Sequence, residues 1–169
     1  MERHVLSILV ENHPGVLSRV SGLFSRRAYN IDSLSVGETE ETSHSRITVA
    51  VMGDADIIEQ IRKQVEKLVD VTEVIVLTPG ESVYRELTLI KVRADAKVRP
   101  EIVGIVEIFR ANIIDVARES MTVEITGDQE KISAFVELMT SYGVIEIVRT
   151  GLTAIQRGNV ALKEHEMKW

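Results

Sequence analysis

The sequence contains no cysteine among its 169 residues, which excludes disulfides, thiolate metal sites and cysteine nucleophiles. It also lacks any run of 18 apolar residues, so we expect no membrane-spanning helix. The first 15 residues include Glu11, Asn12 and His13 where a secretory signal would need an apolar stretch. These absences predict a cytoplasmic protein with no membrane partner.

Positive charge is scarce as well. Twenty basic residues stand against 26 acidic ones, a net charge of −6, which argues against a general nucleic-acid or anionic-membrane surface. The hydrophobic content of 44% is ordinary for a globular protein, and the length suits one domain or two small ones.

The pattern of apolar residues predicts the element order βαββαβ twice over. Alternation indicates strands at 4–10, 29–36, 44–52 and 71–78, and helical spacing indicates helices from 14 to 28 and from 57 to 68. The same order returns with strands at 83–92, 112–117, 121–126 and 144–148 and with helices beginning near Arg99 and Asp128. Right-handed crossovers would close each copy into an antiparallel four-stranded sheet with both helices on one face. The predicted class is therefore α+β, two tandem ferredoxin-like domains.

The predicted division places a first domain at 1–78, a linker at 79–82 and a second domain at 83–157. The charged tail 158–169, ending in the single tryptophan Trp169, is expected to be mobile.

The loop Glu11-Asn12-His13-Pro14-Gly15, between the first strand and helix, is the best candidate for a binding site. Free N–H groups at a helix N-terminus attract a carboxylate, and Gly15 has no side chain to keep a ligand away. The Asn12 amide oxygen can accept a hydrogen bond from an ammonium group, so the loop suits a free α-amino acid. Alternatively, Asn12 merely caps the helix. The corresponding loop of the second copy, 94–100, lacks Asn-x-Pro-Gly, so the site is expected only in the first copy.

No catalytic constellation is present: the sequence has no phosphate loop, nucleophile elbow or thiamine-diphosphate signature. The histidines His4, His13, His44 and His165 are scattered, so we expect no metal site and a solvated state for each. The acidic residues 38–41 are expected to form a solvated hairpin turn.

Several segments carry a resemblance to a known family. These are 10–20, 22–34, 64–71, 85–87, 107–116 and 149–151, which together span nearly the whole chain. They closely resemble the small, regulatory subunit of acetolactate (acetohydroxyacid) synthase, whose N-terminal domain is an ACT domain. Only residues after about Gly158 fall outside the likeness.

The resemblance implies a non-catalytic protein without a cofactor of its own. It would activate a catalytic subunit that carries thiamine diphosphate and Mg²⁺, confer feedback inhibition by valine, and form a homodimer through its ACT domain. The implied valine site joins the loop of one protomer to the start of the second strand of the other, a strand expected at the sheet edge. In this sequence the site residues are Asn12, His13, Pro14, Gly15, Val16, Leu17, Asn30 and Ile31.

Other interpretations remain open. Asn30 could be a turn residue and Ile31 simple core. The chain could be another amino-acid-sensing ACT regulator, a small enzyme with its pocket between the copies, or an RNA-binding ferredoxin-like module. The last would need aromatic platforms on central strands, where this sequence has Ser7, Leu9, Val49 and Val51.

Overall fold

The computed structural model describes residues 1–162, so Trp169, His165 and most of the predicted mobile tail lie outside the described residues. Two compact units make up the chain. The first comprises Met1–Val83 together with the described residues from Leu152 onward, and the second comprises Tyr84–Gly151.

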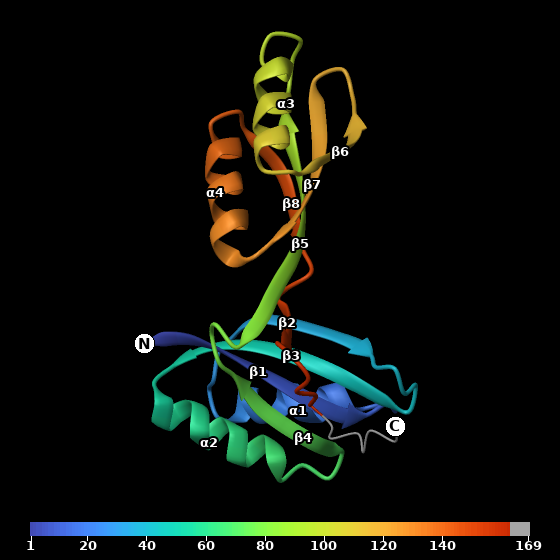
Figure 1. Ribbon diagram of the computed structural model, residues 1–169, viewed down its shortest axis with the longest axis vertical. Coiled ribbons are helices and arrows are strands. Elements are labelled where there is room, and N and C mark those ends of the chain that lie inside the picture. The colour runs from blue at the N-terminus through green and yellow to red at the C-terminus, as the bar shows by residue number, and fades with distance from the viewer. Residues whose placement is uncertain (163–169) are drawn as a thin grey trace. The chain divides into compact units, whose positions relative to one another are not determined.

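The first unit has the predicted βαββαβ order. Its elements are β1 (Glu2–Glu11), α1 (Val16–Arg26), β2 (Ile31–Glu38), β3 (His44–Gly53), α2 (Ala55–Glu66) and β4 (Val71–Leu77). The sheet order is β2-β3-β1-β4, with every neighbouring pair antiparallel. Both helices lie on one face of this sheet (Figure 1), and the core between them is formed by residues such as Leu6, Ile8, Phe24 and Ile61. The ferredoxin-like prediction is confirmed, and β2 is an edge strand.

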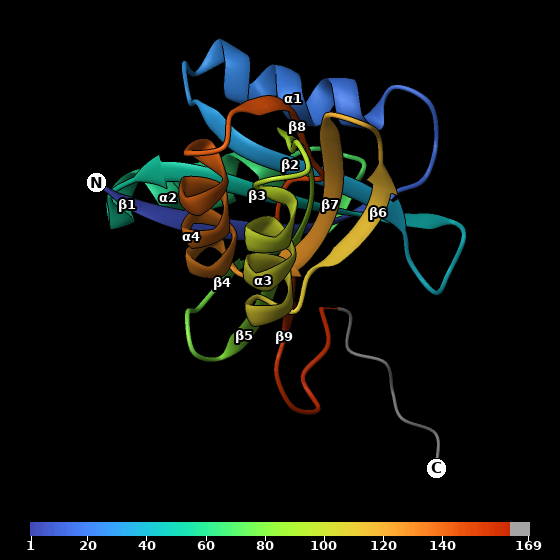
Figure 2. The same cartoon turned by 90° about the horizontal axis from the view of Figure 1, so that it is seen from above.

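The second unit repeats this order. Its elements are β5 (Ser82–Arg93), α3 (Arg99–Ile108), β6 (Asn112–Val116), β7 (Ser120–Gly127), α4 (Gln129–Thr140) and β8 (Val144–Arg149). Its sheet order β6-β7-β5-β8 is the counterpart of the first, and α3 and α4 again share one face (Figures 1 and 2). No helix among residues 1–162 is long and apolar enough to cross a membrane.

Matching β-bulges strengthen the case for an internal repeat. The register shifts between Ile31 and Ser33 in β2, and at the same place, between Ile113 and Asp115, in β6. A bulge inserts one residue and so changes which side chains share a face. Ile31 therefore joins Leu34 on the helix-covered side, where both pack against the core. Strict alternation would place Ile31 and Leu34 on opposite faces of β2, whereas the bulge places both on the same face.

The division into compact units differs from the predicted end of the second domain at residue 157. From Leu152 the chain rejoins the first unit, where a strand that the sequence did not predict, β9 (Thr153–Gln156), pairs with β5. Leu152 and Ala154 are buried there. Ser33 and Ser35, which face away from the helices, are hydrogen-bonded to the backbone of Leu152. Residues within 152–162 thus lie over the helix-free face of the first sheet, which carries the buried Ser7, Leu9 and Thr48.

Candidate functional site

The loop after β1 turns sharply at Gly15, whose φ is +89°. This left-handed conformation suits glycine, and it prevents Gly15 from belonging to the helix. The helix therefore begins at Val16, two residues later than the predicted start at Pro14. Pro14 instead shapes the approach to the helix, and Gly15 is its N-cap residue.

The N-terminus of α1 has no side-chain cap and no acidic residue in its first turn. The Asn12 side chain does not supply a cap, because its Nδ2 donates to Glu38 Oε1 (3.1 Å) and to the Thr42 carbonyl oxygen (2.8 Å). The capping interpretation of Asn12 is therefore wrong. Because both bonds use the amide nitrogen, they leave Oδ1 as the acceptor. The backbone N–H groups of Leu17 and Ser18 donate to no residue of the loop before them.

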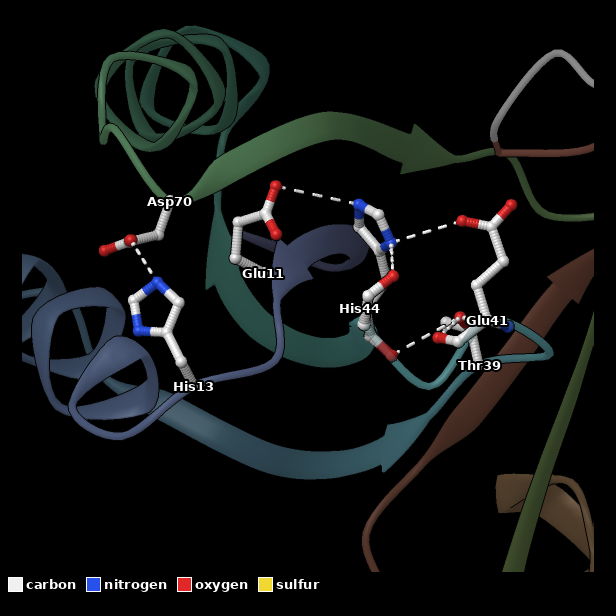
Figure 3. A network of polar contacts seen from close by, with 7 residues as sticks. Glu11, His13, Thr39, Glu41, His44 and Asp70 are labelled. Carbon is white, nitrogen blue, oxygen red and sulfur yellow. Dashed lines mark hydrogen bonds and ion pairs between the residues drawn. The ribbon is translucent and has the colours of Figure 1, made fainter.

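Asp70, which directly precedes β4, binds one side chain of the loop and one of α1. Its carboxylate is almost buried and contacts His13 Nε2 at 2.9 Å and Arg19 Nε at 2.6 Å (Figure 3 shows the contact with His13). The hydrogen bond from Arg19, strengthened by its charge and by His13, holds the pKa of Asp70 below its ordinary value. The Arg19 guanidinium also lies beside Gly15, 3.0 Å from the position of a β-carbon there. Arg19 thus places a guanidinium, whose Nε is paired with Asp70, beside the helix N-terminus.

His44 is not solvated, contrary to the prediction. Its side chain is 14% exposed and lies between two carboxylates, Glu11 at 3.7 Å from Nε2 and Glu41 at 3.3 Å from Nδ1 (Figure 3). The Ser43 hydroxyl is 3.0 Å from the same Nδ1. The acidic hairpin turn is nevertheless solvated as predicted, since Glu38 and Glu40 are exposed and the Glu41 side chain is 40% exposed. Among residues 1–162, no cluster of three or more histidine or acidic side chains could hold a metal ion.

The predicted site residues fall into two groups. Residues 12–17 lie together in the loop and first helical turn, although the Val16 side chain is buried in the core, so only its backbone is available. Leu17 is 42% exposed. Asn30 and Ile31 stand at the opposite end of β2 from Glu38, the residue that Asn12 contacts. At about 3.3 Å per residue this separation is roughly 23 Å, so one chain does not bring the groups together.

Arg19, Asp70 and Glu38 lie against the candidate loop, and the sequence interpretation missed them. Arg19 could have been found, because it follows the N-cap Gly15 by four residues and so returns to the same helix face. Asp70 lies 51 residues from Arg19 and carried no signal of its own.

The equivalent loop of the second copy carries an acidic side chain of its own. Asp95 accepts hydrogen bonds from the backbone N–H groups of Lys97 and Val98, and these bonds lower its pKa. Its carboxylate occupies the N–H groups before α3. The two loops thus differ in charge and in hydrogen bonding, although α3, like α1, has no side-chain cap.

The Asp70 contacts lead to a prediction about pH. A carboxyl group whose pKa is lowered on folding stabilises the protein above its unfolded-state pKa, near 3.8, and this stabilisation is lost as the pH falls through the lower folded-state value. We therefore expect Asp70→Asn to destabilise the protein at pH 7, with a difference from the unsubstituted protein that shrinks below about pH 4. Urea unfolding between pH 3 and 7 measures this. Asp115→Asn, at an exposed position of β6, is the control, and a pH-independent difference for Asp70→Asn would contradict the assignment.

Comparisons with known proteins agree with this architecture. The sequence model described as "AHAS small subunit-like ACT domain" matches residues 6–73, and that described as "Small subunit of acetolactate synthase" matches residues 85–158. The "Probable acetolactate synthase small subunit" of Archaeoglobus fulgidus is 51% identical over 93% of this chain and 98% of its own length. The "Acetolactate synthase small subunit" of Mycolicibacterium smegmatis is 48% identical over 92% of this chain and 91% of its own.

The solved structure of the acetolactate synthase small subunit from Thermotoga maritima superposes with a TM-score of 0.87. It is 48% identical, and the match covers 95% of this chain and 100% of that one. The likeness thus includes both units as well as the loop and edge strand described above. This chain belongs to the family of acetolactate synthase small subunits.

Proposed function

We propose that this chain is a regulatory subunit with no activity of its own, which activates the catalytic subunit of acetolactate synthase in the cytoplasm and makes it sensitive to valine. Thiamine diphosphate and Mg²⁺ then belong to the catalytic partner. The observation that carries the proposal is the open N-terminus of α1, where neither the loop nor the helix supplies a capping side chain.

The chemistry of this position matches a free amino acid. The N–H groups of Leu17 and Ser18 and the nearby Arg19 favour a carboxylate, because the helix dipole and the guanidinium both attract negative charge. Asn12 offers Oδ1 to an ammonium group, since its amide nitrogen is already used by Glu38 and Thr42. The half-exposed Leu17 supplies apolar surface for a branched side chain.

A homodimer would complete the site. Edge strands expose unpaired N–H and C=O groups, and two β2 strands pairing antiparallel across a twofold axis would satisfy them. Such pairing runs the Ile31 end of one strand along the Glu38 end of the other, which is the end that contacts the loop. Asn30 of one protomer would then meet the polar part of valine beside the partner's loop. Ile31 packs against its own core, so it would contribute mainly through its backbone.

A thermal unfolding scan tests this function directly. A ligand that binds only the folded state stabilises it by about 2.7 kcal/mol at a concentration of 100 times Kd, so valine should raise the melting temperature. Leucine, isoleucine and glycine serve as comparisons. A shift only with an amino acid of another class would support a different ACT regulator, and no shift with any would contradict amino-acid sensing.

The assignment to the loop predicts a moderate effect for Asn12→Ala. The substitution removes the proposed acceptor for the ammonium group, together with the bonds to Glu38 and Thr42, and introduces no charge. Loss of the acceptor costs about 0.5–1.5 kcal/mol and weakens valine binding by roughly two- to tenfold. Calorimetric titration measures the change. Asn112→Ala is the control, because Asn112 is an exposed asparagine at the start of β6, away from the loop of the first copy. If the two substitutions changed the Kd for valine equally, the binding site would not be in the loop.

The RNA-binding alternative finds no support in the first sheet. Its helix-free face is covered from Leu152 onward and carries Ser7, Leu9 and Thr48 in place of exposed aromatic platforms.

A further inference from the structure

Two serines of the edge strand β2 hold one residue that lies 117–119 positions away in the sequence. The backbone N–H of Leu152 donates to Ser33 Oγ at 2.7 Å, and Ser35 Oγ donates to the Leu152 carbonyl oxygen at 2.9 Å. Both serines lie on the helix-free face of β2, because their partners in β3 are Ala50 and Thr48. We call these two hydrogen bonds the serine clamp. It fixes both backbone polar groups of Leu152, whose side chain is buried.

Leu152 is the first residue of the chain after the second unit. Two residues earlier, Thr150 is fixed within the second unit, where its N–H donates to the Leu87 carbonyl oxygen at 3.1 Å and its Oγ1 accepts from the Leu87 N–H at 3.1 Å. Only Gly151, with φ +83°, separates the two fixed residues. The α-carbons of Thr150 and Leu152 are two peptide units apart, so at most about 7 Å of chain joins the two fixed residues.

The clamp also lies close along β2 to the start of that strand. Ser33 follows Ile31 by two residues and Asn30 by three. The bulge between Ile31 and Ser33 lies between the clamp and the strand start. A change in the position of the strand start would therefore reach Ser33 within two or three peptide units along the chain.

We propose that Ser33 and Ser35 are positioning residues for regulation: through the serine clamp on Leu152, they transmit the state of the valine site to the second unit across Gly151. The inference rests on the proposed function, since it concerns the response to the same ligand. Neither serine is placed in contact with valine. The clamp contributes to the coupling free energy between valine binding and inhibition. Its removal should therefore weaken inhibition without weakening valine binding.

The double variant Ser33→Ala/Ser35→Ala tests this in the complex with the catalytic subunit. We expect calorimetry to give a Kd for valine within about threefold of the unsubstituted value, while the inhibition of acetolactate synthesis by valine weakens by at least about fivefold, the lower end of typical coupling. The variant Ser33→Thr/Ser35→Thr keeps both hydroxyl groups on a strand that tolerates threonine, so it should retain inhibition.

Ser7→Ala is the matched control. It removes a buried hydroxyl from the same sheet face, but that hydroxyl accepts from Arg46 Nε and does not contact Leu152. We expect it to leave both binding and inhibition within about threefold. Hydrogen exchange adds a second measurement, because loss of Ser33 Oγ should speed exchange of the Leu152 amide in the double variant and not in Ser7→Ala.

The outcomes are distinguishable. Weakened inhibition with retained binding in the alanine double variant, restored by threonine, supports the clamp. Retained binding with full inhibition overturns it, and so does an equal loss of binding and inhibition, which would make the serines part of the site itself. If the unsubstituted protein neither binds valine nor confers inhibition, the proposed function fails and the clamp inference fails with it.

Discussion

Gly15→Asp should abolish valine inhibition by weakening valine binding at least tenfold, while the protein still activates the catalytic subunit. The new carboxylate would take the place intended for the carboxylate of valine at the open N-terminus of α1. Two negative charges about 4 Å apart repel by roughly 1 kcal/mol in water and by several times more at a partly buried site, and steric exclusion adds to this. A tenfold loss requires only about 1.4 kcal/mol.

Backbone strain accompanies this substitution and must be separated from the effect of charge. Gly15 has φ +89°, and a β-carbon there would approach Arg19 Nη1 to 3.0 Å, so the flexible arginine must move. Strain in the left-handed region costs about 1–3 kcal/mol, although aspartate and asparagine tolerate it better than most residues.

Two control variants make the separation. Gly80→Asp introduces the same residue at nearly the same φ, +87°, with nothing within 4 Å of the added β-carbon, so it should lower stability without changing valine binding. Gly15→Asn keeps the size and strain of Gly15→Asp without the charge, and should weaken binding less. Calorimetric titration of valine into all three variants decides the order. Near-normal affinity in Gly15→Asp would place the site elsewhere.

A chain ending at Pro79 should be much less stable than the first unit of the full protein, because that unit includes residues after Leu152. The truncation exposes the face that carries Ser7, Leu9 and Thr48, and it removes Leu152, Ala154 and the serine clamp. Burial of these two side chains and two hydrogen bonds together contribute roughly 4 kcal/mol. That is a large fraction of the 5–15 kcal/mol typical of a whole domain.

The matched variant replaces the second unit by a short Gly/Ser linker that joins Val83 to Leu152 and ends at Gly158. We expect it to fold, to dimerise and to carry much of the contact that activates the catalytic subunit. Valine should bind it but should not inhibit, because regulation requires the second copy. Urea unfolding, calorimetry and activity measurements check these three properties. Equal stability of the two shortened chains would contradict the assignment of the segment after the second unit to the first unit. Normal valine inhibition by the linker variant would show that the second copy has no regulatory role.

The sequence by itself determined the repeated βαββαβ order, because helical and strand periodicities differ and each reports on local burial. Phe24 and Ile61 follow helical spacing and lie in the core between α1, α2 and the sheet. The loop at Gly15 was also predictable, because a Pro-Gly pair just before an apolar helical stripe marks the start of a helix. The pair did not indicate the exact first residue of that helix.

The tertiary structure alone decided which distant groups support that loop. Asp70 reaches His13 and Arg19 only after β4 has paired with β1, and Glu38 reaches Asn12 only after the hairpin of β2 and β3 has formed. Sequence periodicity describes how side chains repeat along one element, so it carries no information about contacts between elements far apart in the chain.

The division of the chain into compact units depends on contacts of the same kind. The segment from Leu152 to Ile155 is apolar enough to form a strand, but its composition does not tell which sheet it joins. The burial of Leu152 and Ala154 against the first unit, with Ser33 and Ser35 holding the backbone of Leu152, follows from long-range packing. Sequence pattern thus determined the elements and the open helix terminus, whereas non-local hydrogen bonds and burial decided how the terminus is supported and where the first unit ends.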